Sequence, residues 1–251
     1  SGLQITTLFM ELPYECPTPD GMAIAPNGDL ILACPNFADS SKPACLMRIT
    51  TDKQISKWLD VPVLPETGLA CPMGIAFNEK GDLYVCDNQG WSGSEQGKNR
   101  GRLLKLVFGE SGELEETITV ASGMEHPNGV RIHNGKVYVT QSSLSGILSK
   151  EGLLVSGVYR FNEDDVNVKV NNTENDVSLV TTVVTRNPKV QYGLDGIVFD
   201  KSGNLYVGNF GDGAIHKITF DEAGNVTGNA VWAQDSTQLT TTDGICMDDA
   251  G

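Results

Sequence analysis

Long apolar runs are missing from this sequence, and no stretch approaches the roughly 20 residues that a membrane-spanning helix needs. Positive charge is also scarce, because 18 lysines and arginines stand against 32 aspartates and glutamates, which gives a net charge of −14. Nucleic acids and anionic membranes both attract a cationic surface, so the composition argues against either as a partner. It suits a cation-binding protein, or simply a highly charged protein that stays dissolved.

Other patterns are absent as well. The six cysteines include no C-x-x-C pair of the kind that marks zinc or redox sites. They could be small core residues or form disulfides, and Cys34 and Cys45 flank one loop across which they could be bridged. Helical periodicity is nearly absent, and no nucleophile-elbow motif points to a serine esterase. No secretory segment opens the chain, and the sequence leaves the compartment and the oligomeric state open.

One pattern recurs five times: a glycine, a short apolar strand, a turn and a second apolar strand. The first copy, at positions 20–32, is DGMAIAPNGDLIL, and later copies begin at Met73, Asn128, Asp195 and Asp243. Repeats of about 40–50 residues with four short strands each are typical of a β-propeller. Third and fourth strands fit between the copies. We therefore predict an all-β fold, a single propeller domain over residues 1–251 that is truncated in its fifth blade.

The longest interval between copies lies in the third repeat. It contains Ser142–Leu154, which we interpret as an extended loop that either shapes a substrate entrance or is a tolerated surface insertion. The polar stretch Asn162–Asp176 follows as a turn-rich connection.

The residues that open the five copies would project into one mouth of the central channel, and four of them carry oxygen donors: Asp20, Asn128, Asp195 and Asp243. Two like charges 4 Å apart cost about 4 kcal/mol at an effective dielectric constant of 20, so three close carboxylates need either a proton or a cation among them. Because the donors are all hard oxygens, calcium or magnesium is favoured over zinc or copper, and calcium tolerates such a mixed set better. The alternative is that each Asp-Gly pair only caps a turn.

Three of these segments resemble the metal-ligand blades of the gluconolactonase, senescence-marker-protein and luciferin-regenerating-enzyme family: DGIVFD at 195–200, DGICMD at 243–248 and HPNG at 126–129. The resemblance runs along the whole chain and extends to diisopropyl-fluorophosphatase-like hydrolases. It implies a six-bladed β-propeller, of which this chain holds about four and a half blades. It also implies a channel calcium held by Asp20, Asn128, Asp195 and Asp243.

The sequence departs from the family pattern in two ligands. Asp20 stands where glutamate is usual and Asp195 where asparagine is common, so the predicted site is one charge more acidic. Met73 falls in the second blade, which in the family gives no ligand.

From this resemblance we expect a calcium-dependent hydrolase that opens small lactones. The family positions make Asp243 the base that activates water, and they place His126 and Asn128 against the substrate. Two alternatives stay open: a phosphotriesterase that uses the same metal site with Asp243 as nucleophile, and a non-enzymatic binding module with a structural calcium. Asn88, Gln141 and Asn209 end second strands of their repeats, and we expect their side chains to satisfy backbone groups.

Overall fold

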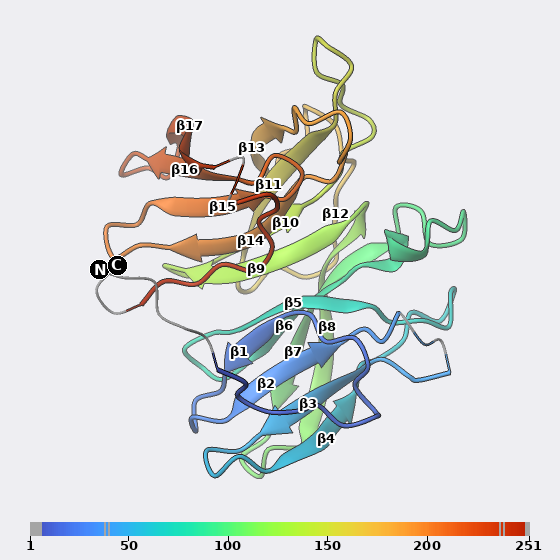
Figure 1. The fold of residues 1–251 in the computed structure, drawn as a ribbon. Coiled ribbons are helices and arrows are strands. Elements are labelled where there is room, and N and C mark those ends of the chain that lie inside the picture. The colour runs from blue at the N-terminus through green and yellow to red at the C-terminus, as the bar shows by residue number, and fades with distance from the viewer. Residues whose placement is uncertain (1–6, 38, 40, 236, 238, 249–251) are drawn as a thin grey trace.

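The structure is a computed structural model that describes residues 7–37, 39, 41–235, 237 and 239–248. Strands dominate it, with a single short 3-10 helix, η1 (Gln89–Ser92), in the described part of the chain. The strands form four sheets, and the predicted all-β fold is confirmed (Figure 1). None of the helical structure in the described ranges is long and apolar enough to cross a membrane.

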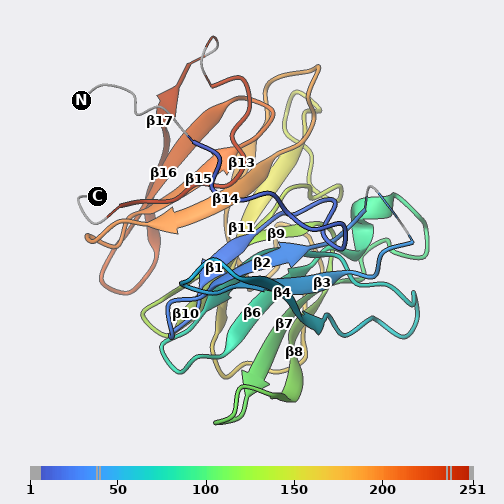
Figure 2. The same cartoon turned by 60° about the horizontal axis from the view of Figure 1, so that its bottom comes forward.

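Each sheet contains four antiparallel strands in chain order, as expected for a propeller blade. The first sheet consists of β1 (Met22–Ile24), β2 (Leu30–Cys34), β3 (Cys45–Ile49) and β4 (Ile55–Asp60). The four antiparallel strands of the second sheet are β5 (Pro72–Phe77), β6 (Leu83–Asp87), β7 (Gly101–Phe108) and β8 (Leu114–Met124), and a short fifth strand, β12 (Val168–Lys169), is added beside β8. Figure 2 shows the hairpin of β7 and β8, in green, projecting from the body of the protein.

The third and fourth sheets repeat this arrangement. The third consists of β9 (Pro127–His133), β10 (Lys136–Gln141), β11 (Val155–Asn162) and β13 (Leu179–Val184). The fourth consists of β14 (Leu194–Phe199), β15 (Leu205–Asn209), β16 (Ala214–Phe220) and β17 (Val226–Gln234). The predicted loop Ser142–Leu154 joins β10 to β11.

Turn chemistry explains the regular hairpins between the first and second strands. Asn134 and Gly135 both have positive φ angles, of 49° and 71°, which is the conformation that a two-residue type I′ turn requires. This turn matches the right-handed twist of β9 and β10, so it fixes their register.

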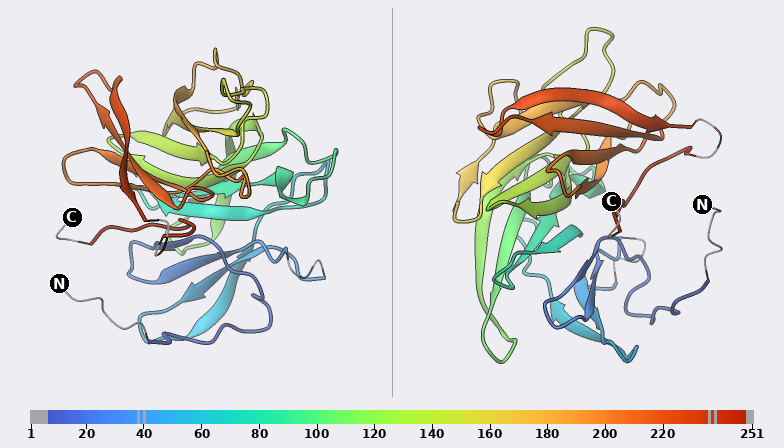
Figure 3. Two further views of the ribbon diagram at one scale, coloured as in Figure 1. Left: turned by 45° about the horizontal axis from the view of Figure 1, so that its top comes forward. Right: turned by 90° about the vertical axis from the view of Figure 1, so that its left-hand side faces the viewer.

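The core lies between neighbouring sheets, because the inward faces of adjacent blades pack on each other. Tyr84 of the second sheet and Tyr159 of the third are both fully buried in one such cluster. The innermost strands lie side by side around the channel, β1 against β5, β5 against β9, and β9 against β14. Figure 3 shows the first sheet (blue) and the fourth (orange to red), with strands of the second (cyan to green) and third (yellow-green) sheets between them.

Glycine allows this close approach of the innermost strands. A Cβ built on Gly129 in β9 would lie 2.5 Å from the carbonyl oxygen of Asp195 in β14. The same close approach occurs at the corresponding glycine of the other three described blades. A Cβ built there would lie 2.3–2.4 Å from the carbonyl oxygen of the residue that opens the next copy: Met73 for Gly21, Asn128 for Gly74 and Asp243 for Gly196. The glycine that follows each channel residue therefore sets the distance between blades.

Two features of the chain differ from the sequence prediction. The fifth copy, predicted to begin a strand at Asp243, has no strand over positions 241–248. In the other copies the first strand pairs with the strand after the turn, and the described residues after Asp243, 244–248, contain no such partner strand. The stretch Asn162–Asp176 is more than a connection, because β12 (Val168–Lys169) within it pairs in parallel with β8 of the second sheet.

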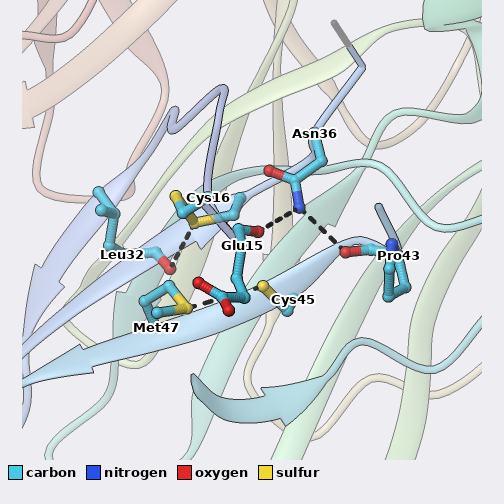
Figure 4. Close-up of a disulfide and its surroundings, with 8 residues drawn as sticks. Glu15, Cys16, Leu32, Asn36, Pro43, Cys45 and Met47 are labelled. Carbon is cyan, nitrogen blue, oxygen red and sulfur yellow. Dashed lines mark hydrogen bonds between the residues drawn. A yellow bond between two sulfur atoms is a disulfide. The ribbon is translucent and has the colours of Figure 1, made fainter. Parts of the chain in front are cut away.

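The suggested bridge between Cys34 and Cys45 is wrong. These residues do face each other across β2 and β3, but Cys34 forms a disulfide with Cys16, in the segment before β1, and Cys45 stays a buried free thiol. Figure 4 shows that the amide nitrogen of Asn36, beside this bridge, donates to the carbonyl oxygens of Glu15 and Pro43, both at 3.0 Å. The partner of Cys34 thus depends on where the N-terminal segment packs.

Loss of this disulfide should lower the stability of the fold. For Cys16→Ser we expect the free energy of unfolding to fall by about 3 kcal/mol, the value typical of a closed loop of this size. Denaturant unfolding measures the effect, with Cys45→Ser as the control for loss of a thiol. Peptide mapping without reduction should recover a Cys16–Cys34 cross-link, and recovery of a Cys34–Cys45 cross-link would contradict the structure.

Candidate functional site

The predicted channel residues take equivalent places in their blades. Met73, Asn128 and Asp195 are the second residues of β5, β9 and β14, and Asp20 lies two residues before β1. Asp243 lies against the fourth blade, because a Cβ on Gly196 would touch its carbonyl oxygen. The chain thus brings together, at one end of the innermost strands, residues that are more than 200 positions apart in sequence.

The charges of the three aspartates act on one another. Burial, and then the charge of Asp243, raise the pKa of Asp20 to about 6. Burial raises the pKa of Asp195 to about 8, with further upward contributions from the charges of Asp243 and Asp20 and from a side-chain hydrogen bond to Asp243. A side-chain hydrogen bond from Asn128 works in the opposite direction. Every charged group that shifts these two pKa values is another carboxylate, so the site is strongly negative when ionised.

Asn128 is buried and held by two neighbours that the sequence analysis did not single out. Its amide nitrogen donates to the hydroxyl oxygen of Tyr192 at 3.1 Å and to that of Ser142 at 3.3 Å. The Ser142 hydroxyl in turn donates to the carbonyl oxygen of Leu194 at 2.7 Å. Burial, followed by the charge of Asp195, raises the pKa of Tyr192 to about 12, which keeps its hydroxyl protonated. These contacts fix the orientation of the Asn128 amide.

In the sequence, only their positions within the repeat could have pointed to Tyr192 and Ser142 as neighbours of Asn128. Tyr192 lies three residues before a channel aspartate, and Ser142 directly follows a second strand. Neither position has a residue-type pattern that marks it, so the network became visible only in the folded chain.

His126 lies at the junction of the second and third blades. Its ring packs beside Gly90 of η1, since a Cβ there would lie 3.0 Å from the ring Cε1. Its Nδ1 is buried and has no hydrogen-bond partner among the described residues, and burial lowers its pKa. The imidazole is therefore favoured in the neutral form, and its contact with substrate stays a prediction.

Of the three polar residues predicted to end second strands, Gln141 and Asn209 do so, whereas Asn88 directly follows β6 and precedes η1. Gln141 accepts from the backbone amides of Glu125 and His126, and Asn209 donates to the carbonyl of Val184, as expected. For Asn88 the expectation is wrong, because neither its amide nitrogen nor its amide oxygen has a partner in the described part of the chain.

The donor types at the channel mouth fit a hard divalent cation. Asp20, Asn128, Asp195 and Asp243 offer only oxygen, and a cation would remove the mutual repulsion that raises two of their pKa values. Their spacing is wider than that of an assembled centre, since within the described ranges no three His, Cys, Asp or Glu residues are grouped closely enough to hold a metal ion. Asp243 is exposed and outside any strand, so it is the donor whose position is least fixed.

The raised pKa values predict how stability should respond to pH. A carboxyl whose pKa is higher in the folded chain binds more protons there than in the unfolded chain. The metal-free protein should therefore lose stability as the pH rises from about 4 through the folded pKa of Asp195, about 8. Melting temperatures in chelator at pH 5.5 and 8.5 measure this effect. Asp195→Asn is the control and should flatten the pH dependence, and an equally steep loss in that variant would contradict the assignment.

Comparison with solved structures finds other proteins with this β-propeller fold. A gluconolactonase from Xanthomonas campestris is 15% identical with a TM-score of 0.56, and the match covers 92% of this chain and 66% of that one. The luciferin-regenerating enzyme is 17% identical with a TM-score of 0.52, covering 86% and 64% of the two chains. A streptogramin B lyase is 15% identical with a TM-score of 0.51, covering 90% and 57%.

These matches confirm the predicted resemblance at the level of the fold. This chain spans 57–66% of the length of these three proteins. No protein-family model matches the sequence, and comparison with curated proteins gives no match. Because a lyase has the same fold as a gluconolactonase, the fold alone does not select a reaction.

Proposed function

We propose that this protein is a lactone hydrolase whose reaction takes place at the channel mouth and depends on calcium. The convergence of Asp20, Asn128, Asp195 and Asp243 at one end of the innermost strands is the observation that carries the proposal. The gluconolactonase among the solved structures supports it through the fold, which would present such a site in the same architecture.

Four side chains would hold the calcium, namely those of Asp20, Asn128, Asp195 and Asp243. When bound, the ion would supply a Lewis acid for the carbonyl oxygen of the lactone and would favour the ionised form of the carboxyl groups. Its binding should release protons, since the pKa values of Asp20 and Asp195 are raised to about 6 and 8 without it.

Side chains of the protein would carry out proton transfer and position the substrate. Asp243, which is exposed, accepts a proton from the attacking water at a carboxylate oxygen. The water oxygen bonds to the carbonyl carbon, the ring C–O bond breaks, and the proton passes to the released alkoxide, which gives a hydroxy acid. Asn128 is held by Tyr192 and Ser142 and positions the substrate without needing to reorient.

A substrate screen tests this function directly. Aldonolactones, aromatic lactones and phosphotriesters should be offered to the protein with calcium and with chelator. We expect calcium-dependent opening of lactones and little turnover of phosphotriesters. Turnover of phosphotriesters alone would replace the proposal with the phosphotriesterase alternative, and no turnover of any substrate, with calcium still raising the melting temperature, would favour a binding module.

Calcium should also stabilise the fold in a pH-dependent way. A ligand that binds only the native state adds about 2.7 kcal/mol at a hundredfold excess over its dissociation constant, which corresponds to a rise of several degrees in melting temperature. The rise should be larger at pH 8.5 than at pH 5.5, where protons compete for Asp20 and Asp195. Identical melts with calcium and with chelator at both pH values, together with no bound metal by elemental analysis, would exclude the calcium site.

A further inference from the structure

A pocket of ≈ 530 Å³ lies between the first and second blades, and its lining does not include the channel residues Asp20, Asp195 and Asp243. Its walls come from the β2–β3 connection, the β4–β5 connection and the segment from Asn88 through η1, and they include Asn36, Phe37, Cys71 and Trp91. The rings of Phe37 and Trp91 lie against each other with centroids 4.4 Å apart. Much of the lining is therefore aromatic or aliphatic, with a few amide groups among it.

The pocket opens at the same end of the blades as the channel mouth. The backbone N–H of Asn88 donates to the carbonyl oxygen of Cys71, two residues before Met73, and the N–H of Ser142 donates likewise to His126, two residues before Asn128. Asn88 is thus the second-blade counterpart of Ser142, whose hydroxyl contacts Asn128. Cys71 links the two regions, because its Sγ lies 3.9 Å from Sδ of Met73.

Asn88 is the unusual group in this pocket. It is 0% exposed, yet neither the donor nor the acceptor of its side-chain amide has a partner in the described ranges. A buried amide left in this state is costly, and native proteins rarely keep one without a purpose. The neighbouring Asn36 adds a second acceptor, since its amide oxygen is also buried and unpartnered while its nitrogen bonds to Glu15 and Pro43.

The pocket has no excess of one charge. Its charged lining residues are Lys42 and Asp60, of opposite sign, and both are engaged, Lys42 over the ring of Tyr14 and Asp60 with Lys57. A neutral ligand is favoured on this ground, and the net charge of −14 further disfavours an anion.

We propose that this pocket is a binding site for a neutral, flat aromatic molecule that carries an amide or lactam group. The ring would pack against Phe37 and Trp91, and the amide of the ligand would pair with that of Asn88, donor to acceptor and acceptor to donor. Both amide atoms of Asn88 are closed off from water, so entry requires a wall side chain to rotate. Phe37 and Trp91, 39% and 41% exposed, are the aromatic side chains of the wall and are only partly packed. The proposal concerns binding and does not depend on lactone hydrolysis.

Benzamide and benzoate form a matched pair of probes, because they share a ring and differ in the neutral amide against the carboxylate. Titration calorimetry on the 251-residue chain should show saturable binding of benzamide in the millimolar range and much weaker binding of benzoate. Asn88→Leu should weaken benzamide binding at least tenfold and, because it removes an unpartnered buried amide, should raise the melting temperature. Trp91→Leu, at a half-exposed position, should weaken binding without unfolding the protein.

The control is Asn209→Leu, since Asn209 is equally buried but bonded to Thr185, Val184 and Asp212. That variant should lower the melting temperature and leave benzamide binding unchanged. The proposal is overturned if benzamide does not saturate the wild-type protein, if Asn88→Leu binds it as tightly as the wild type, or if Asn88→Leu is the less stable protein.

Discussion

Replacement of Asp243 by asparagine is expected to lower lactone turnover by about 10²–10⁴-fold, the usual cost of losing a general base. Asparagine keeps the shape of the side chain and one oxygen donor, but it cannot accept the proton of the attacking water. Calcium should still bind, more weakly, because Asp20, Asn128 and Asp195 remain. Turnover is to be measured at saturating calcium, so that a change in metal affinity does not enter the comparison.

Asp195→Asn is the matched control for this experiment. Both substitutions remove one negative charge from the same cluster, in which Asp243 raises the pKa of Asp195. A purely electrostatic role would make the two variants similar, whereas a proton-transfer role for Asp243 makes its loss far more severe. Equal activities, or a more active Asp243→Asn protein, would refute the assignment of Asp243 as the base.

Gly129→Ala should have the largest effect on the fold. The new methyl group would lie 2.5 Å from the carbonyl oxygen of Asp195 and 2.8 Å from Cγ2 of Ile197, so β9 and β14 would have to move apart. Overpacking of this kind typically costs about 1–3 kcal/mol, and here the obstacle is backbone, which yields less easily than a side chain. Because Asp195 itself must shift, lactone turnover should fall along with the melting temperature.

The control for Gly129→Ala is Gly244→Ala in the same 251-residue chain. Gly244 is the corresponding glycine of the fifth copy, and a Cβ there would meet nothing within 4 Å. This variant should melt within a degree or two of the wild type. A Gly129→Ala protein as stable as the Gly244→Ala protein would show that the close approach between blades does not limit the fold.

The repeat determined most of the architecture in advance. Turns such as Asn134-Gly135 and the apolar runs around them specify hairpins through local interactions, so they can be read from a short window of sequence. Alignment of the five copies also identified Asp20, Asn128 and Asp195 as equivalent positions. In the structure these three residues lie at one end of the innermost strands. Periodicity succeeded there because each blade repeats the same local geometry.

Pairings between segments that lie far apart in the sequence could not be predicted from such local patterns. The sequence offers Cys34 five other cysteines as partners, and only the packing of the N-terminal segment selects Cys16 over the nearby Cys45. β12 forms because a two-residue segment pairs with the free edge of β8, and no local sequence pattern predicts that pairing. Both depend on which parts of the folded chain come together.

The sequence by itself therefore determined the class of fold, the number of four-stranded repeats and the equivalent residues at the starts of their first strands. The tertiary structure decided the environment of those residues: the Tyr192 and Ser142 contacts that hold Asn128, the burial that raises the pKa of Asp195, and the unpartnered amide of Asn88. The physical reason is that residue type and spacing fix which groups a strand presents, whereas burial and hydrogen-bond partners depend on the neighbouring blades, which the chain supplies from distant positions.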